Sequence, residues 1–113
     1  MSKIVCFGEV LWDIFPTHKK IGGAPLNVAL RLQTFENEVA LISCLGDDKL
    51  GNELLLELQK YRISSLYIQK IKTYKTSTVS ISLDKNGSAS YLINHPCVYF
   101  RRQILIYKLE HKL

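Results

Sequence analysis

The alternation of strand and helix patterns over residues 1–71 constrains the fold more than any other feature of this sequence. Three short apolar runs have the length and β-branched content of buried strands: KIVCFG at 3–8, EVALISCLG at 38–46 and SLYIQKI at 65–71. Helical patterns separate these runs. Strands that alternate with helices build right-handed βαβ units, in which helices cover a parallel sheet. The sequence therefore predicts an α/β fold with a βαβαβ parallel sheet.

The two helical patterns lie at residues 25–35 and at about 48–61. Apolar residues at helical spacing line one face of a helix and mark the side that is buried. On the first helix this face is expected to contain Val28, Ala29, Leu32 and Phe35. On the second it is expected to contain Leu50, Leu54, Leu58 and Tyr61, with Asp47 or Asp48 as the N-cap.

A glycine-rich stretch, IGGAPLNVALR at 21–31, opens the first helix. Residues 9–16 before it continue in an extended conformation, and THKK at 17–20 is expected to be a polar connection. Paired glycines occur where the backbone turns sharply or comes close to another group, and Pro25 suits the first turn of a helix. The free N–H groups of such a helix start attract anions and hydroxyl oxygens. The stretch predicts a loop that faces a ligand, although it has neither the P-loop nor the G-x-G-x-x-G spacing.

The segment STVSISLDKNGSASYLI at 77–93 alternates apolar and polar residues around DKNG, and this pattern predicts an antiparallel hairpin. Asn86 and Gly87 are expected to supply the positive φ angles of its turn. A half-polar hairpin does not fit inside a parallel sheet that is covered on both faces, so we expect it to project as a flap or an edge. Its half-apolar face is a candidate surface for a homodimer.

Few side chains in the chain form a pattern that suggests chemistry. Asp13 could accept hydrogen bonds from two sugar hydroxyls, and Asn27 could donate and accept toward neighbouring hydroxyls. The alternative is that Asp13 caps a turn and Asn27 is a solvated helix residue. Asp47 and Asp48 suit either a metal or a helix cap, and Trp12 suits either a sugar site or the core. The residues alone leave these alternatives open.

Composition and charge exclude several classes of function. The formal net charge of the 113 residues is +5, but three of these charges are the excess of the segment from Tyr99 onward. The remainder has too small an excess for a basic nucleic-acid-binding face. No apolar run approaches the ~20 residues of a membrane span, and the N-terminus lacks a signal-peptide core, so a cytoplasmic protein is expected. Cys6, Cys44 and Cys97 are predicted to be reduced residues without a disulfide or metal.

Four stretches in order resemble the PfkB (ribokinase-like) carbohydrate kinases, particularly the fructokinase type. They are GEVLWDIFP, GGAPLNVA, VALISCLGDDKLGNELL and TSTVSISLDKNGSASY, and they fall within residues 3–96. The family expects glycine or serine at the position of Glu36, where a helix ends. The resemblance implies a partial ribokinase-like fold, ATP-dependent phosphorylation of fructose or a similar sugar with magnesium, and a lid formed by the hairpin. It also implies that Asp13, Gly22, Gly23 and Asn27 bind the sugar.

The resemblance also implies what this chain does not carry. Family members are more than twice as long, and their later half supplies the anion hole, the catalytic base and the ATP pocket. We therefore expect residues 1–98 to be the N-terminal part of a kinase domain and 99–113 to be an atypical tail. No catalytic or metal-binding residue is expected here, and ATP and magnesium are not expected to bind well, so the isolated chain should be inactive.

Two alternatives to a kinase follow from the same expectation. The chain could be a non-catalytic fragment that binds sugar or dimerises, or an inactive relic of a frameshifted kinase gene. The flanking genomic sequence tests the relic hypothesis, which fails if no kinase frame continues there.

Overall fold

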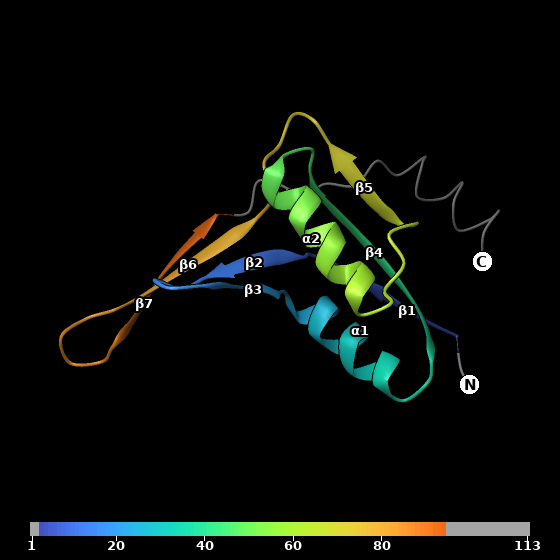
Figure 1. The fold of residues 1–113 in the computed structure, drawn as a ribbon, viewed down its shortest axis with the longest axis horizontal. Helices are drawn as coiled ribbons and strands as arrows, with labels where there is room; N and C mark the ends of the chain where they lie inside the picture. Colours follow the sequence, from blue (N-terminus) through green and yellow to red (C-terminus); the bar gives the residue numbers. More distant parts are fainter. Residues whose placement is uncertain (1–2, 95–113) are drawn as a thin grey trace.

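The computed structural model describes residues 3–94, which form two helices and two sheets (Figure 1). The first sheet, which we call the body sheet, has the order β1-β4-β5, and both of its strand pairs are parallel. Its strands are β1 (Lys3–Phe7), β4 (Glu38–Gly46) and β5 (Ile68–Ile71). Helix α1 (Ala24–Thr34) leads to β4, and helix α2 (Lys49–Lys60) leads from β4 to β5. The predicted βαβαβ sheet is confirmed.

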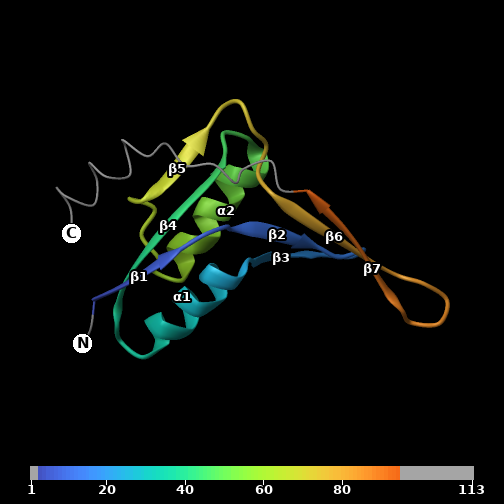
Figure 2. The same cartoon turned by 180° about the vertical axis from the view of Figure 1, so that it is seen from behind.

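The second sheet projects from one side of the body, and we call it the projecting sheet (Figure 1 and Figure 2). Its order is β3-β2-β6-β7, in which only the central β2–β6 pair is parallel. Its strands are β2 (Leu11–Ile14), β3 (Lys19–Gly22), β6 (Thr78–Leu83) and β7 (Ala89–Asn94). The hairpin projects as predicted, and it is joined to β2 and β3.

Strand β3 corrects the expectation of a polar connection followed by a glycine loop. Lys19 and Lys20 pair with Ile14 and Asp13 of β2, and Gly22 is the last residue of β3. Residues 17–20, THKK, are all polar. The stretch therefore lacks the alternation of apolar and polar residues that usually predicts a strand. The strand forms because the antiparallel partner β2 satisfies its backbone.

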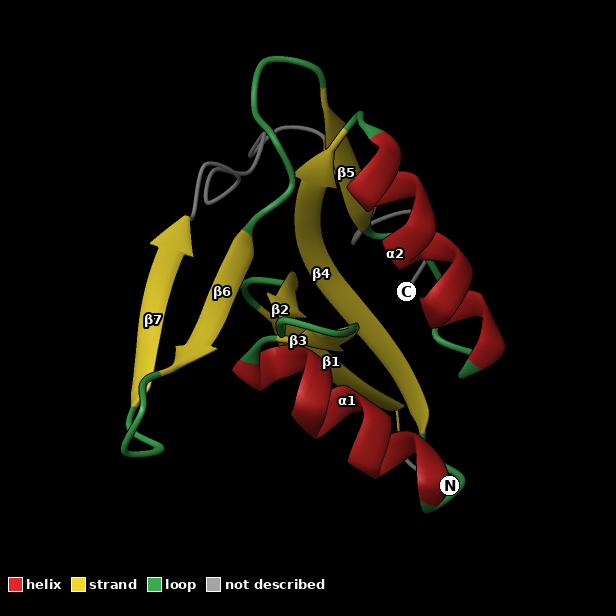
Figure 3. Cartoon of the chain, turned by 60° about the vertical axis from the view of Figure 1, so that its left-hand side comes forward, coloured by secondary structure: helices red, strands yellow, loops and turns green. Residues whose placement is uncertain are grey.

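Both helices pack on the same face of the body sheet, as Figure 3 shows for α1 and α2 beside β4. The core between them contains these buried residues: Cys6, Val10, Trp12, Leu26, Ala29, Val39, Leu41, Leu45, Leu54, Leu58, Ile63 and Ile68. Fully burying one Leu or Ile side chain contributes roughly 1.5–3 kcal/mol. Because the cluster contains residues of the body sheet, of both helices and of β2, it holds these parts together.

The buried face of α1 differs from the predicted one. Leu26 and Ala29 are buried, whereas Val28 is 52% exposed and Phe35 is 68% exposed. Phe35 is the C-cap, so it lies beyond the last helical residue and does not continue the helical face. Burial of Ala29 agrees with the prediction.

Helix α2 follows its prediction more closely. Leu54 and Leu58 are fully buried, and Asp48 is the N-cap that accepts a hydrogen bond from Gly51 N. Tyr61, the C-cap residue, is 52% exposed, because the helix ends one residue before it. Of the two roles considered for the Asp47–Asp48 pair, helix capping is the one that the structure contains.

Positive φ angles occur directly after the C-cap of each helix and in the hairpin turn. Glu36, directly after the C-cap of α1, has φ +61°, and Arg62 after α2 has φ +60°. In the hairpin turn Gly87 has φ +80°, but Asn86 does not have a positive φ, so that part of the prediction is wrong. The strands pair from Leu83 with Ala89, so residues 84–88 form the loop between them.

Within residues 3–94, no helix is long and apolar enough to cross a membrane. Cys6 and Cys44 are buried and form no disulfide among the described residues, and burial raises the pKa of the Cys6 thiol. Cys97 and the predicted tail at 99–113 lie outside the described residues.

Candidate functional site

Three connections between the body and the projecting sheet meet in one place. Gly8 leads from β1 toward β2, and a Cβ there would lie 2.8 Å from Pro25 Cγ. Gly23 leads from β3 into α1, and a Cβ there would overlap the carbonyl oxygen of Glu9. Trp12 N donates to Ser77 O at 3.1 Å, which brings the chain entering β6 to the same place. Gly8 and Gly23, of which only Gly23 belongs to the predicted ligand loop, therefore allow this close approach.

Asp13 and Gly22 are in contact across the β2–β3 pair. Asp13 lies on β2, and a Cβ on Gly22 would overlap Asp13 Oδ2 and lie 3.1 Å from Cγ. The absence of a side chain at position 22 therefore makes room for the carboxylate. Among residues 3–94 this carboxylate accepts no hydrogen bond and forms no ion pair, so its oxygens are available to a ligand.

The start of α1 lies directly after this pair. Gly23 is the N-cap with φ +106°, a conformation that favours glycine, and no side chain caps the helix. Asn27 N donates to Gly23 O at 3.0 Å, and the Asn27 side chain is exposed. The site thus combines a free carboxylate, uncapped N–H groups and an exposed amide, a set that suits a ligand with several hydroxyl groups.

Asp13 lies within residues 9–16, which the sequence predicted to be extended. It lies on β2 of the projecting sheet, beyond the bend at Gly8 that ends β1. The apolar run through residues 3–15 conceals the bend, because both segments are extended. Trp12 on the same strand is a core residue, and its Nε1 donates to Leu50 O at 2.8 Å.

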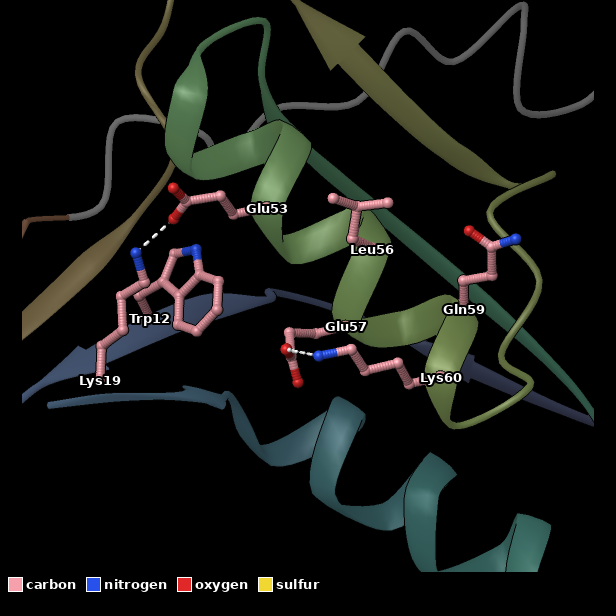
Figure 4. A pocket seen from close by; sticks show the side chains of 7 residues that line it. All are labelled: Trp12, Lys19, Glu53, Leu56, Glu57, Gln59 and Lys60. Carbon is pink, nitrogen blue, oxygen red and sulfur yellow. Dashed lines mark hydrogen bonds and ion pairs between the residues drawn. The ribbon is translucent and has the colours of Figure 1, made fainter.

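A separate open pocket of about 540 Å³ lies between the projecting sheet and α2 (Figure 4). It is lined by Trp12, Lys19, Glu53, Leu56, Glu57, Gln59 and Lys60. Its charged groups are paired with one another: Lys19 with Glu53, and Lys60 Nζ with Glu57 Oε1 at 2.8 Å. None of the four predicted sugar-binding residues lines it, so it is distinct from the site at Asp13.

The carboxylate of Asp48 forms a hydrogen-bonded cluster with Thr76, a residue that the sequence did not single out. Oδ1 accepts from Gly51 N at 2.8 Å and from Thr76 Oγ1 at 2.7 Å, and Oδ2 accepts from Thr76 N at 2.9 Å. Burial raises the pKa of Asp48, but these hydrogen bonds together with Lys75 outweigh it and hold the pKa below its ordinary value. In the sequence the signal was the Asp47–Asp48 pair, but the partner Thr76 is 28 residues away and only the structure shows the contact.

Two helices packed on a parallel body sheet, with a second sheet projecting from it, define a protein of the α/β class. The sequence profile of the pfkB family carbohydrate kinase matches residues 1–100, so the chain belongs to this family. The resemblance found in the sequence is confirmed.

Individual relatives are fructokinases. The fructokinase of Vibrio alginolyticus is 28% identical over 96 residues, which cover 80% of this chain and 31% of that protein. The solved structure of a Vibrio cholerae fructokinase in its apo form has a TM-score of 0.79 at 26% identity and covers 87% of this chain and 36% of that one. A Xylella fastidiosa fructokinase with bound ATP has a TM-score of 0.80 at 29% identity, covering 89% and 34%. The ribokinase-like fold is thereby confirmed, and the chain spans about a third of the length of the curated relatives it matches.

Proposed function

We propose that this chain is the sugar-binding and lid part of a kinase that phosphorylates fructose or a similar sugar with ATP. Membership of the carbohydrate kinase family and the fructokinase names of its relatives support the proposal. The observation that carries it is the Asp13 carboxylate, which has no partner among residues 3–94 and lies over Gly22 next to the uncapped start of α1.

Four residues have distinct roles in this proposal. Asp13 accepts hydrogen bonds from two sugar hydroxyls, and Asn27 donates and accepts toward their neighbours. Gly22 and Gly23 leave room for the Asp13 carboxylate and the Glu9 carbonyl, because a Cβ at either position would overlap those atoms. In the proposal, the backbone at these two glycines also approaches the sugar. The hairpin formed by β6 and β7 acts as the lid that excludes water from the reacting phosphate.

The ATP and magnesium sites are proposed to lie outside the described residues. A relative with bound ATP supports the use of ATP in the family. Among residues 3–94, however, no group of three or more His, Cys, Asp or Glu side chains could hold a metal ion. Both oxygens of Asp48 accept hydrogen bonds from the protein itself. The described residues therefore do not fit a magnesium site, and the catalytic base is proposed to lie beyond this chain.

The remaining parts of the proposal concern the whole chain. In this proposal residues 1–98 are the N-terminal part of a kinase domain, residues 99–113 are an atypical tail, and the protein acts in the cytoplasm. A homodimer through the hairpin is favoured by the exposed apolar side chains of Leu83, Tyr91, Leu92 and Ile93.

A coupled assay with ATP and fructose should give no activity above the blank for the isolated chain. Clear activity would overturn the proposal that the isolated chain is inactive.

A thermal melt with and without fructose tests the sugar site. Fructose at about 100 times its dissociation constant should stabilise the native chain by about 2.7 kcal/mol. The shift should disappear in Asp13→Asn and shrink in Asn27→Ala. It should persist in Glu38→Gln, a matched control in which an exposed carboxylate on β4 is neutralised. A wild-type melt that does not respond to fructose or other hexoses contradicts the proposal.

A further inference from the structure

The Asp48 cluster joins three parts of the molecule that are distant in sequence. Asp48 caps α2, while its two oxygens hold the hydroxyl and the backbone N–H of Thr76. Thr76 Oγ1 in turn accepts from Gly46 N, at the end of β4, at 3.0 Å. Thr76 is only 2% exposed, so water competes little for these bonds. One carboxylate thus links the end of β4, the start of α2 and the segment that leads into β6.

Two glycines are fitted around this cluster. A Cβ on Gly46 would lie 2.6 Å from Tyr74 O and 2.8 Å from Asp48 Oδ2. A Cβ on Gly51 would overlap Gly46 O and lie 2.9 Å from Thr76 Oγ1. Side chains at these positions would displace Thr76 from the carboxylate. The spacing of glycine and aspartate in GDDKLG is therefore the spacing that this junction needs.

The junction is connected to Asp13 by the parallel pairing of β6 with β2. Trp12 N donates to Ser77 O, and the strands then pair from Trp12 with Thr78 and from Asp13 with Val79. Thr76 is thus three residues before the residue that pairs with Asp13. Strand β6 pairs with β2 in one register, and Asp13 lies opposite Val79 in that pairing. A contact that fixes the start of β6 therefore also fixes the position of Asp13 on β2.

We propose that Asp48 is a positioning residue of the sugar site: by holding Thr76 it fixes β6, and through β6 it fixes Asp13 on β2. The inference rests on the proposed sugar site at Asp13. Asp48 itself does not touch the sugar. Its effect is to fix the distance between the Asp13 carboxylate and the N–H groups at the start of α1, so that the carboxylate and the N–H groups can bind the same ligand.

Thr76→Val tests the link, because it removes the hydroxyl while keeping the shape of the side chain. Fructose affinity, measured by the fluorescence of Trp12, the only tryptophan, should fall about tenfold. Thr76→Ser keeps the hydroxyl and should restore affinity to within about twofold. Thr78→Val, at the first residue of β6, is the matched control and should bind as the wild type does. Unchanged affinity in Thr76→Val overturns the inference.

Amide hydrogen exchange gives a readout that does not depend on the sugar. In Thr76→Val, and in Asp48→Asn if the first variant does not fold, exchange should accelerate in β2 and β6 but not in the buried part of β4. Acceleration throughout the chain, or none, overturns the positioning role. If the wild type binds no sugar, the proposed function fails, and the exchange pattern still decides whether Asp48 fixes the projecting sheet.

Discussion

The carboxylate of Asp13 occupies the space above Gly22 that a side chain at position 22 would fill. Asp13 Cγ lies 3.1 Å from the place of that Cβ, and Leu11 Cδ1 lies 3.2 Å from it. Both are nearer than ordinary van der Waals contacts, so any larger residue must displace the carboxylate. A glycine in β3 and an aspartate in β2 are therefore one structural unit, although eight residues separate them in the sequence.

Gly22→Ala should abolish the stabilisation by fructose and destabilise the chain by about 1–3 kcal/mol, the usual cost of overpacking. The measurement is a denaturant melt with and without fructose. In an Asp13→Ala background the same substitution should cost less, since the overlapping carboxylate is gone. Additive effects of the two substitutions would contradict the contact as the cause.

Glu36, which directly follows the C-cap of α1, is strained. Its φ of +61° lies in the left-handed region, which costs a side-chain-bearing residue about 1–2 kcal/mol. Glu36→Gly should remove this cost, and the larger entropy of the unfolded glycine chain offsets part of the gain. We expect a net stabilisation of about 0.5–1 kcal/mol in thermal or urea unfolding.

Glu38→Gly is the matched control for this prediction. Glu38 is also exposed but lies in β4, where glycine weakens a strand. The control should be destabilised, and stabilisation of both variants would show that charge, not backbone strain, is responsible.

Elements with a strong local pattern could be predicted from the sequence. The three strands of the body sheet, both helices, the cap on α2 and the hairpin arms all have periodic apolar residues or capping chemistry within a few positions. The glycine expected where Glu36 stands corresponds to a real positive φ. Local interactions determine these features, so a local reading of the sequence finds them.

Features that depend on distant partners could not be predicted. Strand β3 is polar and exists through its pairing with β2. Thr76 has no pattern around it that announces its bonds to Asp48, 28 residues away. The packing face of α1 depends on where the body sheet lies. The role of Asp13 in binding sugar stays a prediction, because its free carboxylate is suggestive only together with the family.

Trp12 connects the projecting sheet to α2 through its ring and one hydrogen bond, and a single substitution tests the two contributions together. Trp12→Phe leaves an aromatic ring but removes the Nε1 donor from Leu50 O. We expect a loss of about 1–3 kcal/mol, from the lost bond and the reduced volume together. Circular dichroism is the measurement, since the variant has no tryptophan fluorescence. Tyr61→Phe at an exposed position should change stability by less than about 0.5 kcal/mol.

The pKa of Asp48 gives the chain a predictable response to acid. Because the hydrogen bonds from Thr76 and Gly51 outweigh burial, the folded pKa is below the unfolded one, which is about 3.9. The ionised carboxylate therefore stabilises the fold above the unfolded pKa, and this contribution is lost as the pH falls through the folded pKa. The difference in unfolding free energy between wild type and Asp48→Asn should be constant from about pH 7 to about pH 5 and shrink below about pH 4. Urea melts across that range measure it, with Asp47→Asn as the control for losing one negative charge beside α2. A difference that grows toward low pH would mean that Asp48 does not hold Thr76 as an ionised acceptor.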